Sequence, residues 1–271
     1  MTVEQFERVR RLSLKLTGIA LADRHRELLS FRCRRLKLDA PASLDALLQA
    51  SERGDPVARQ QMIGLLTISH TGFFRNPWHF DIAAGHAMCA INSRGSARMW
   101  SAAAATGEEA YSLAMAVIDA AGCDAPPVRI VATDINPKVL EIARLAEYGE
   151  PALSSLRPEL RTRFFSVQAR SKRWRISEAV QRMVEFVQLN LSAEAWPVDG
   201  PFDVVFCRNV LMYLELAHRF SILERIASLI APDGLLILDP AEHLGEAEHL
   251  FGAGNKGVYR RRLAPQGTGI S

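Results

Sequence analysis

The chain has 271 residues, 48% hydrophobic and 23% charged, an ordinary globular composition that can fill one catalytic domain and a small accessory domain. Its formal net charge of +3 favours no class of partner, and its cysteines (Cys33, Cys89, Cys123 and Cys207) form no C-x-x-C pair, which indicates reduced thiols rather than a disulfide framework. No apolar run reaches the ~18 residues of a membrane helix, and the charged N-terminus lacks the apolar core of a signal peptide, so we expect a cytoplasmic protein with no direct membrane insertion.

Residues 3 to about 66 carry helical patterns and no strand signal. Amphipathic stretches follow Thr2 and cover 23–36, and shorter ones cover 43–51 and 56–66, with glycine and proline between them. We therefore expect a small all-helical N-terminal domain over residues 1–70.

From about residue 98 the pattern changes to apolar strands that alternate with helices. Strands are predicted over 98–103, 128–133, 184–189, 202–207, 234–238 and 257–262, and helices over 108–121, 137–146 and 216–230. Such alternation predicts a parallel sheet covered on both faces, a doubly wound, Rossmann-like α/β domain over 71–271. The Arg- and Ser-rich stretch at about 155–186 interrupts it, and we expect a small antiparallel β insertion there.

The loop after the first predicted strand favours a cationic ligand. It holds small residues, the single glycine Gly107 and two carboxylates, Glu108 and Glu109, at the start of the next helix. Carboxylates at this place would repel a pyrophosphate and suit the ammonium and sulfonium of S-adenosylmethionine (AdoMet). The alternative is that both simply complement the helix dipole.

Polar residues end the other predicted strands. Asp134, some 25 residues after the glycine loop, is placed to accept hydrogen bonds from a ribose, although it could instead cap the next helix, a role that suits Asn136 better. The pairs at 190–191 and 208–209 follow further strands, and their side chains would share the same crevice. Each is a weak signal alone, because Asn after a strand is usually a turn former.

Five segments together, in order and spacing, resemble the CheR family of chemotaxis receptor methyltransferases. They are T-G-F-F-R at 71–75, W-S-A-A-A-A-T-G-E-E-A-Y-S at 100–112, A-T-D-I at 132–135, P-F-D-V-V-F-C-R-N-V-L-M-Y at 201–213 and P-D-G at 232–234. The resemblance implies that AdoMet donates a methyl group and leaves as S-adenosylhomocysteine (AdoHcy). It implies cofactor binding by Thr71, Arg75, Glu109, Asp134, Asn190, Leu191, Arg208 and Asn209.

The resemblance also implies the reaction. Arg75 and Tyr213 would lie near the transferred methyl group as catalytic residues, and the substrates would be glutamate side chains on the cytoplasmic helices of chemoreceptors (methyl-accepting chemotaxis proteins), methylated for sensory adaptation. The inserted ribbon resembles the family's β-subdomain, which in some members grips a receptor C-terminus. Residues 166–173 are short and lack glycine, so we expect no dependence on such a tether.

A basic helix suggests how the substrate docks. Residues 23–37 hold six basic residues, among them Arg32, Arg34, Arg35 and Lys37, against two acidic ones. We expect them to steer a Glu-bearing receptor helix, the alternatives being a solvated face or nucleic-acid contact. The spacing of the histidines matches no metal motif, so no metal is expected. His70 and His79 are candidates for the cofactor entrance.

Three alternative functions can be weighed on the sequence alone. The chain could methylate another protein or a small molecule, or it could be a non-catalytic AdoMet-binding signalling protein. A nucleic-acid methyltransferase is disfavoured, because C-R-N-V at 207–210 stands where such enzymes often carry N/D-P-P-Y/F. We therefore expect no nucleic-acid partner.

Overall fold

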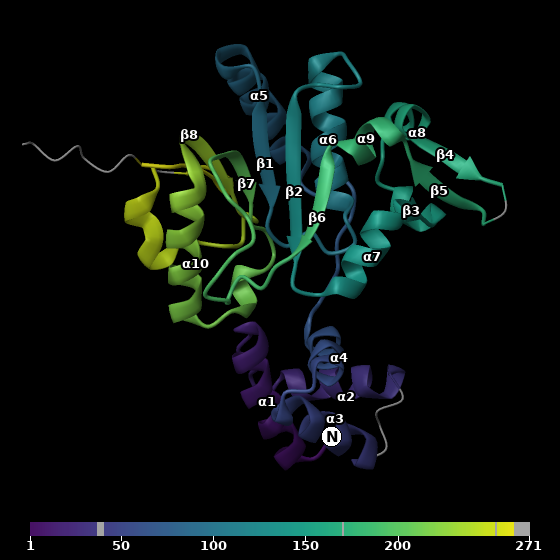
Figure 1. The fold of residues 1–271 in the computed structure, drawn as a ribbon, viewed down its shortest axis with the longest axis vertical. Helices are drawn as coiled ribbons and strands as arrows, with labels where there is room; N and C mark the ends of the chain where they lie inside the picture. The colour runs from purple at the N-terminus through teal and green to yellow at the C-terminus, as the bar shows by residue number, and fades with distance from the viewer. Residues whose placement is uncertain (37–40, 170, 253, 263–271) are drawn as a thin grey trace, which may run out of the picture.

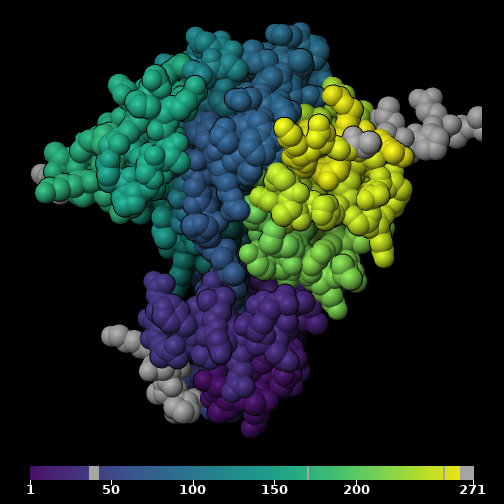
Figure 2. Space-filling model, turned by 180° about the vertical axis from the view of Figure 1, so that it is seen from behind, coloured from purple at the N-terminus to yellow at the C-terminus, as the bar shows by residue number. Residues whose placement is uncertain are grey.

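The computed structural model describes residues 1–36, 41–169, 171–252 and 254–262. A lobe of N-terminal helices lies at one end of a larger α/β part, and a small β insertion projects from the side of that part (Figure 1). The N-terminal lobe stands out below the rest of the molecule in the space-filling view (Figure 2).

The N-terminal lobe consists of four helices with a core of their own. They are α1 (Val3–Thr17), α2 (His25–Arg35), α3 (Pro41–Arg53) and α4 (Pro56–Leu66), close to the predicted ranges. Helix α1 begins with a capping box, in which the Thr2 hydroxyl accepts the Gln5 N–H and the Gln5 side chain accepts the Thr2 N–H. Phe6, Leu48 and Met62 are buried together in this lobe. The division predicted between residues 70 and 71 stays a prediction.

The large sheet is mostly parallel, in the order β6-β2-β1-β7-β8-β9, with only β9 antiparallel among the described strands. The predicted doubly wound, Rossmann-like class is confirmed. The strands are β1 (Ala97–Ser101), β2 (Val128–Asp134), β6 (Val184–Gln188), β7 (Phe202–Phe206), β8 (Ile230–Ile237) and β9 (Val258–Arg260).

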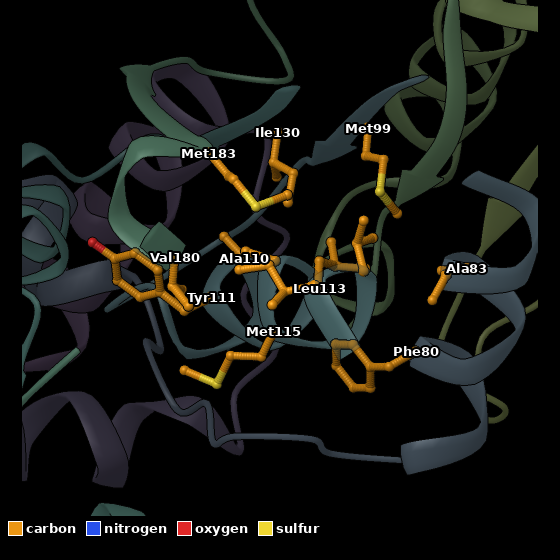
Figure 3. Close-up of a cluster of buried hydrophobic side chains, with 14 of the residues drawn as sticks. Phe80, Ala83, Met99, Ala110, Tyr111, Leu113, Met115, Ile130, Val180 and Met183 are labelled. Atoms are coloured by element: carbon orange, nitrogen blue, oxygen red, sulfur yellow. The ribbon is translucent and has the colours of Figure 1, made fainter. Parts of the chain in front are cut away.

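Helices cover both faces of the sheet, because alternate strand residues point to opposite sides. Met99 of β1 packs with α5 (Pro77–Arg94) and α6 (Glu108–Ala121), whereas its neighbour Trp100 packs with α10 (Leu216–Leu229) on the other face. Figure 3 shows Met99 and Ile130 pointing from their strands toward Leu113 of α6. Helix α7 (Pro137–Leu145) packs beside β2 and β6.

Helix α5 has no counterpart among the predicted elements. Its buried positions are mainly alanines (Ala83, Ala84, Ala87 and Ala90), so its apolar stripe is weak in the sequence although it fills a tight gap beside α6.

The insertion contains a three-stranded antiparallel sheet in the order β3-β5-β4. Its first strand lies before the expected range of 155–186, and residues 184–186 belong to β6 of the large sheet. A two-residue strand such as β3 leaves no period in a sequence. The elements are β3 (Glu147–Tyr148), η1 (Glu150–Leu153), α8 (Pro158–Phe164), β4 (Phe165–Gln168), β5 (Arg173–Ile176) and α9 (Glu178–Arg182); η2 (Leu211–Tyr213) and η3 (Gly245–Leu250) lie later in the chain.

The carboxyl edge of the sheet faces the N-terminal helices (Figure 1). Strand β1 is flanked by β2 and β7, so the chain crosses to opposite sides of β1 and opens a crevice at this switch point. The two parts are also joined directly: the Ala20 N–H donates to the Tyr213 carbonyl at 2.9 Å, and the Glu215 N–H donates to the Gly18 carbonyl at 3.1 Å.

Candidate cofactor and active site

A deep pocket lies between the N-terminal helices and the carboxyl edge of the sheet. It encloses about 1300 Å³, counting the part open to solvent, which is ample for a nucleoside-sized ligand. Its walls come from residues 17–32, from the connection 66–75 and from the loops after β1, β2, β6 and β7. The pocket brings together every residue predicted to bind the cofactor or act in catalysis: Thr71, Arg75, Glu109, Asp134, Asn190, Leu191, Arg208, Asn209 and Tyr213.

The loop after β1 lets a ligand approach the backbone, because Ala102, Ala103 and Ala105 line the pocket there. Gly107 closes this loop with a φ of 95°, and a Cβ added to it would lie 2.9 Å from the Cβ of Ala143. Any side chain at this position would therefore displace α7 or the loop itself.

The two adjacent carboxylates, predicted as a pair, differ in the structure. Glu109 lines the pocket, whereas Glu108 is buried away from it and accepts the Thr106 hydroxyl at 2.7 Å. Burial raises the pKa of the Glu108 carboxyl, and the Thr106 hydrogen bond offsets part of that rise. Of these two glutamates, only Glu109 is placed to contact a ligand in this pocket.

Glu109 and Arg208 form the central ion pair of the pocket. One Glu109 oxygen accepts the Ser101 hydroxyl at 2.8 Å, and the other accepts an N–H from Arg208 at 3.2 Å. The Arg208 side chain is 1% exposed, so the Glu109 carboxylate is needed to compensate its buried positive charge. Arg208 also donates to the Asn76 side chain. Burial raises the pKa of the Glu109 carboxyl, against the opposing effects of Arg208 and Ser101.

Asp134 ends β2 at the edge of the pocket. Its oxygens accept the N–H groups of Ala105 at 3.0 Å and of Asn136 at 2.9 Å, which ties the ends of β1 and β2 together. Burial raises its pKa, and these N–H donors counter that rise. Asn136 caps α7 by accepting the Lys138 N–H, as expected, so Asp134 is not the helix cap.

Two acidic residues that contact the lining of the pocket were missed in the sequence. Asp239 and Glu242 follow β8, whose carboxyl end lies at the same edge as those of β1 and β7. Asp239 lies 3.9 Å from the Arg75 guanidinium, and Glu242 accepts backbone N–H groups from the loop that carries Asn209. Burial raises the pKa of Asp239, but hydrogen bonds from Ala241 and Asn209 and the charges of Arg208 and Arg75 outweigh it, so the pKa is lowered.

The residues after β6 connect the pocket to the N-terminal lobe. The Asn190 side chain donates to the Leu16 carbonyl at 2.9 Å, and its oxygen accepts the Ser192 N–H. Leu191, the next residue, is buried and also lines the pocket. Asn190 therefore has a structural role in addition to its place in the pocket.

The two histidines proposed for the cofactor entrance lie in different places. His70 lines the pocket, but His79 does not: it is fully buried on α5, with Nε2 2.8 Å from the Lys256 carbonyl. The expectation for His79 is wrong, because this third residue of α5 faces the sheet, with its ring 6.3 Å from that of Phe206 in β7. Phe73 packs edge-on against Tyr148 and Phe165, the core role that its apolar ring suggests.

The basic residues of α2 do not act alike. Arg34 and Arg35 are exposed, whereas Arg32 is half-buried, lines the pocket and donates to the carbonyls of Leu65 and Thr67 at the end of α4. Arg32 thus differs from the expected docking residue, since its guanidinium is engaged within the lobe. Lys37 lies outside the described residues.

The donor set fits AdoMet better than it fits a nucleotide with phosphates. Two carboxylates line the pocket, Glu109 from the first turn of α6 and Asp134 from the end of β2, and their negative charge favours a cationic ligand over one with phosphates. Within residues 1–36, 41–169, 171–252 and 254–262, no group of three or more His, Cys, Asp or Glu residues is arranged to hold a metal. In the same part of the chain, no helix is both long and apolar enough to cross a bilayer.

Comparisons with known proteins identify the family of this chain. Residues 69–259 match the family described as CheR methyltransferase, SAM binding domain. The chain is 36% identical to chemotaxis protein methyltransferase 2 of Pseudomonas aeruginosa over an alignment of 261 residues, and this alignment covers 95% of this chain and 93% of that relative. It is 35% identical over 258 residues to the chemotaxis protein methyltransferase of Escherichia coli, covering 94% and 89%. The chain belongs to the CheR methyltransferase family and carries its AdoMet-binding domain.

Proposed function

We propose that this protein transfers a methyl group from AdoMet to glutamate side-chain carboxylates of chemoreceptors, forming glutamyl methyl esters for sensory adaptation. The observation that carries the proposal is the pocket in which nine predicted residues from five separate segments meet, in a chain of this family. Relatives that align with nearly the whole chain are chemotaxis protein methyltransferases. The substrate region of such receptors lies in the cytoplasm, where we expect the enzyme to act.

The cofactor would be held by the strand-end residues. We assign Glu109 and Asp134 to its cationic and hydroxyl groups, and Thr71, Asn190, Leu191, Arg208 and Asn209 to the remaining contacts, because all line the pocket. Bound AdoMet supplies an activated methyl group and leaves as AdoHcy. The ion pair between Glu109 and Arg208 keeps the Glu109 carboxylate fixed before the ligand arrives.

The substrate carboxylate needs no general base, since a glutamate with an ordinary pKa of ~4.3 is ionised at neutral pH. What the protein must supply is alignment and the exclusion of water, which can lower a barrier by roughly 7–11 kcal/mol. Arg75 is suited to aligning the substrate, because its side chain is 46% exposed at the pocket and is held only loosely by Asp239, at 3.9 Å. It can orient an incoming carboxylate through paired N–H donors. Competition from Asp239 would keep that grip modest, so the nucleophile is not over-stabilised.

Tyr213 would complete the reacting side of the pocket. It lies in η2 opposite the N-terminal helices, with its backbone carbonyl bonded to Ala20. Its ring or hydroxyl can orient a reactant there.

Docking is proposed to use the exposed part of α2. Arg34 and Arg35 are exposed at the end of α2, a helix that lines the pocket through Leu28 and Arg32, and the Arg34 guanidinium lies over the ring of Phe31. Their charge suits a Glu-bearing receptor helix. We propose further that a receptor C-terminal tether is not required, because the turn between β4 and β5 is short.

The test is to incubate the purified protein with methyl-labelled AdoMet and membranes from its own cells. Label on a receptor-sized band that mild alkali releases as methanol would support the ester chemistry, and the Asp134→Ala variant in parallel should label weakly. Alkali-stable label, or label in the small-molecule or RNA fraction, would favour another substrate. AdoHcy binding without any label would favour the non-catalytic alternative.

A further inference from the structure

Glu242 gathers an unusual number of backbone donors. One of its oxygens accepts the N–H groups of Asn209 at 2.8 Å and Asp239 at 3.2 Å. The other accepts those of Val210 at 3.1 Å and Met212 at 3.3 Å. Three of these four donors belong to the loop between β7 and α10, which also holds Arg208 and Tyr213.

Burial raises the pKa of the Glu242 carboxyl, and the backbone N–H donors of Asn209, Asp239 and Met212 offset part of that rise. The Glu242 side chain is buried, with the residue 4% exposed, and no ion pair to it occurs within the described residues. A buried carboxylate without a cation is costly unless hydrogen bonds surround it, as they do here. A polar or apolar residue of similar size would leave buried N–H groups unpaired, so the loop is built around this anion.

The loop that Glu242 holds has an irregular backbone that directs side chains into the pocket. Asn209 has a left-handed φ of 57°, which turns the chain so that Arg208, Asn209 and Tyr213 all line the cavity. On its outer side the loop pairs with the N-terminal lobe, through the bond from Ala20 to Tyr213. Glu242 is the anchor on its inner side.

We propose that Glu242 is a positioning residue for methyl transfer, fixing the backbone from Asn209 to Met212 and thereby aiming Arg208, Asn209 and Tyr213 into the pocket. Glu242 itself does not line the pocket. The proposal rests on the proposed function only for its kinetic readout, because cofactor affinity and amide protection report on the loop whatever the substrate is.

Two variants separate the parts of this idea. Glu242→Gln keeps the shape but replaces one acceptor oxygen by an NH₂ group, so two of the four backbone donors lose their partner. Glu242→Asp keeps the charge but retracts it by one methylene, so it reaches fewer donors. We expect both to raise the Kd for AdoHcy and lower kcat, by about 10- to 100-fold for Gln, since a misplacement of ~1 Å can cost that much.

Asp203→Asn is the matched control. Asp203 is also a buried carboxylate on this part of the fold, accepting the Arg98 N–H at 2.8 Å and pairing with Arg94, but it lies at the opposite end of β7 from Arg208. Its loss should lower the melting temperature while leaving AdoHcy affinity and kcat within about twofold of the wild type. A Glu242→Gln variant that behaves in the same way would overturn the proposal.

A measurement on the unaltered protein covers the case in which the Gln variant does not fold. Hydrogen exchange should show the amides of Asn209, Val210 and Met212 protected by at least about 100-fold over an unstructured peptide. Exchange at the unstructured rate, or a folded Glu242→Asp variant with unchanged AdoHcy affinity, would also overturn the proposal. A wild-type protein that binds AdoHcy but labels no receptor would instead count against the proposed function alone.

Discussion

Replacing Glu109 by Gln tests the electrostatics of the pocket. The substitution removes the charged partner of Arg208, a side chain that is 1% exposed, while Gln retains one acceptor and Arg208 keeps its bond to Asn76. Breaking a buried ion pair by removing one partner typically costs about 3–5 kcal/mol, and the two remaining hydrogen bonds favour the lower end, about 3 kcal/mol of unfolding free energy. Loss of the carboxylate should also raise the Kd for AdoHcy by roughly 10- to 100-fold, the range for losing one charged hydrogen bond.

Glu108→Gln is the control at the neighbouring position. Glu108 is buried too, but it faces Thr106 instead of Arg208 and does not line the pocket, so at neutral pH its replacement should cost little stability and leave AdoHcy affinity unchanged. Urea unfolding and titration calorimetry on both variants measure the two effects separately. Equal losses of stability in the two variants, or an unchanged AdoHcy affinity in Glu109→Gln, would refute the reasoning.

Three further outcomes are expected. Asp134→Ala should weaken AdoHcy binding by ~1–3 kcal/mol, and calorimetry showing unchanged affinity would remove Asp134 from the site. Because burial raises the pKa of the Glu108 carboxyl, the folded protein holds this proton more tightly, and the resulting stabilisation is present below the ordinary pKa of 4.5 and is lost as the pH rises through the folded pKa. The free energy of unfolding of Glu108→Gln in urea should therefore rise relative to that of the wild type from pH 4.5 to about 7. A constant difference would contradict the burial of the Glu108 carboxyl. The double change Arg34→Ala and Arg35→Ala should slow receptor methylation about tenfold at low salt, with a smaller gap at high salt and unchanged AdoHcy binding; a rate unaffected at every salt concentration would remove α2 from docking.

The predicted pocket residues follow from one rule, that parallel strands present their carboxyl ends at a common edge. The rule places Glu109, Asp134 and Asn209 together without any contact information. It applies equally to Asp239, the second residue after the end of β8, so the sequence does hold a signal for that residue. Glu242 lies three residues further on, and only the folded turn brings its carboxylate back to Asn209 in the loop after β7.

Contacts between distant segments could not be predicted in this way. The pairing of residues 18–20 with 213–215 joins short irregular stretches, which have no period to detect. The role of Arg32 was hidden for a related reason. Composition marks α2 as basic, but only the packing of α2 on α4 directs one of its arginines inward to helix-end carbonyls.

The short antiparallel contact between residues 18–20 and Tyr213 has a consequence for synthesis. The helical lobe leaves the ribosome before the α/β part and can bury its own core early, whereas the loop around Tyr213, on the opposite side of the pocket, is translated almost two hundred residues later. A nascent or truncated polypeptide ending before that wall would thus contain folded helices and half a binding cavity. Because both halves line the pocket, we expect a chain that ends before residue 208 to bind AdoMet more weakly than the full chain.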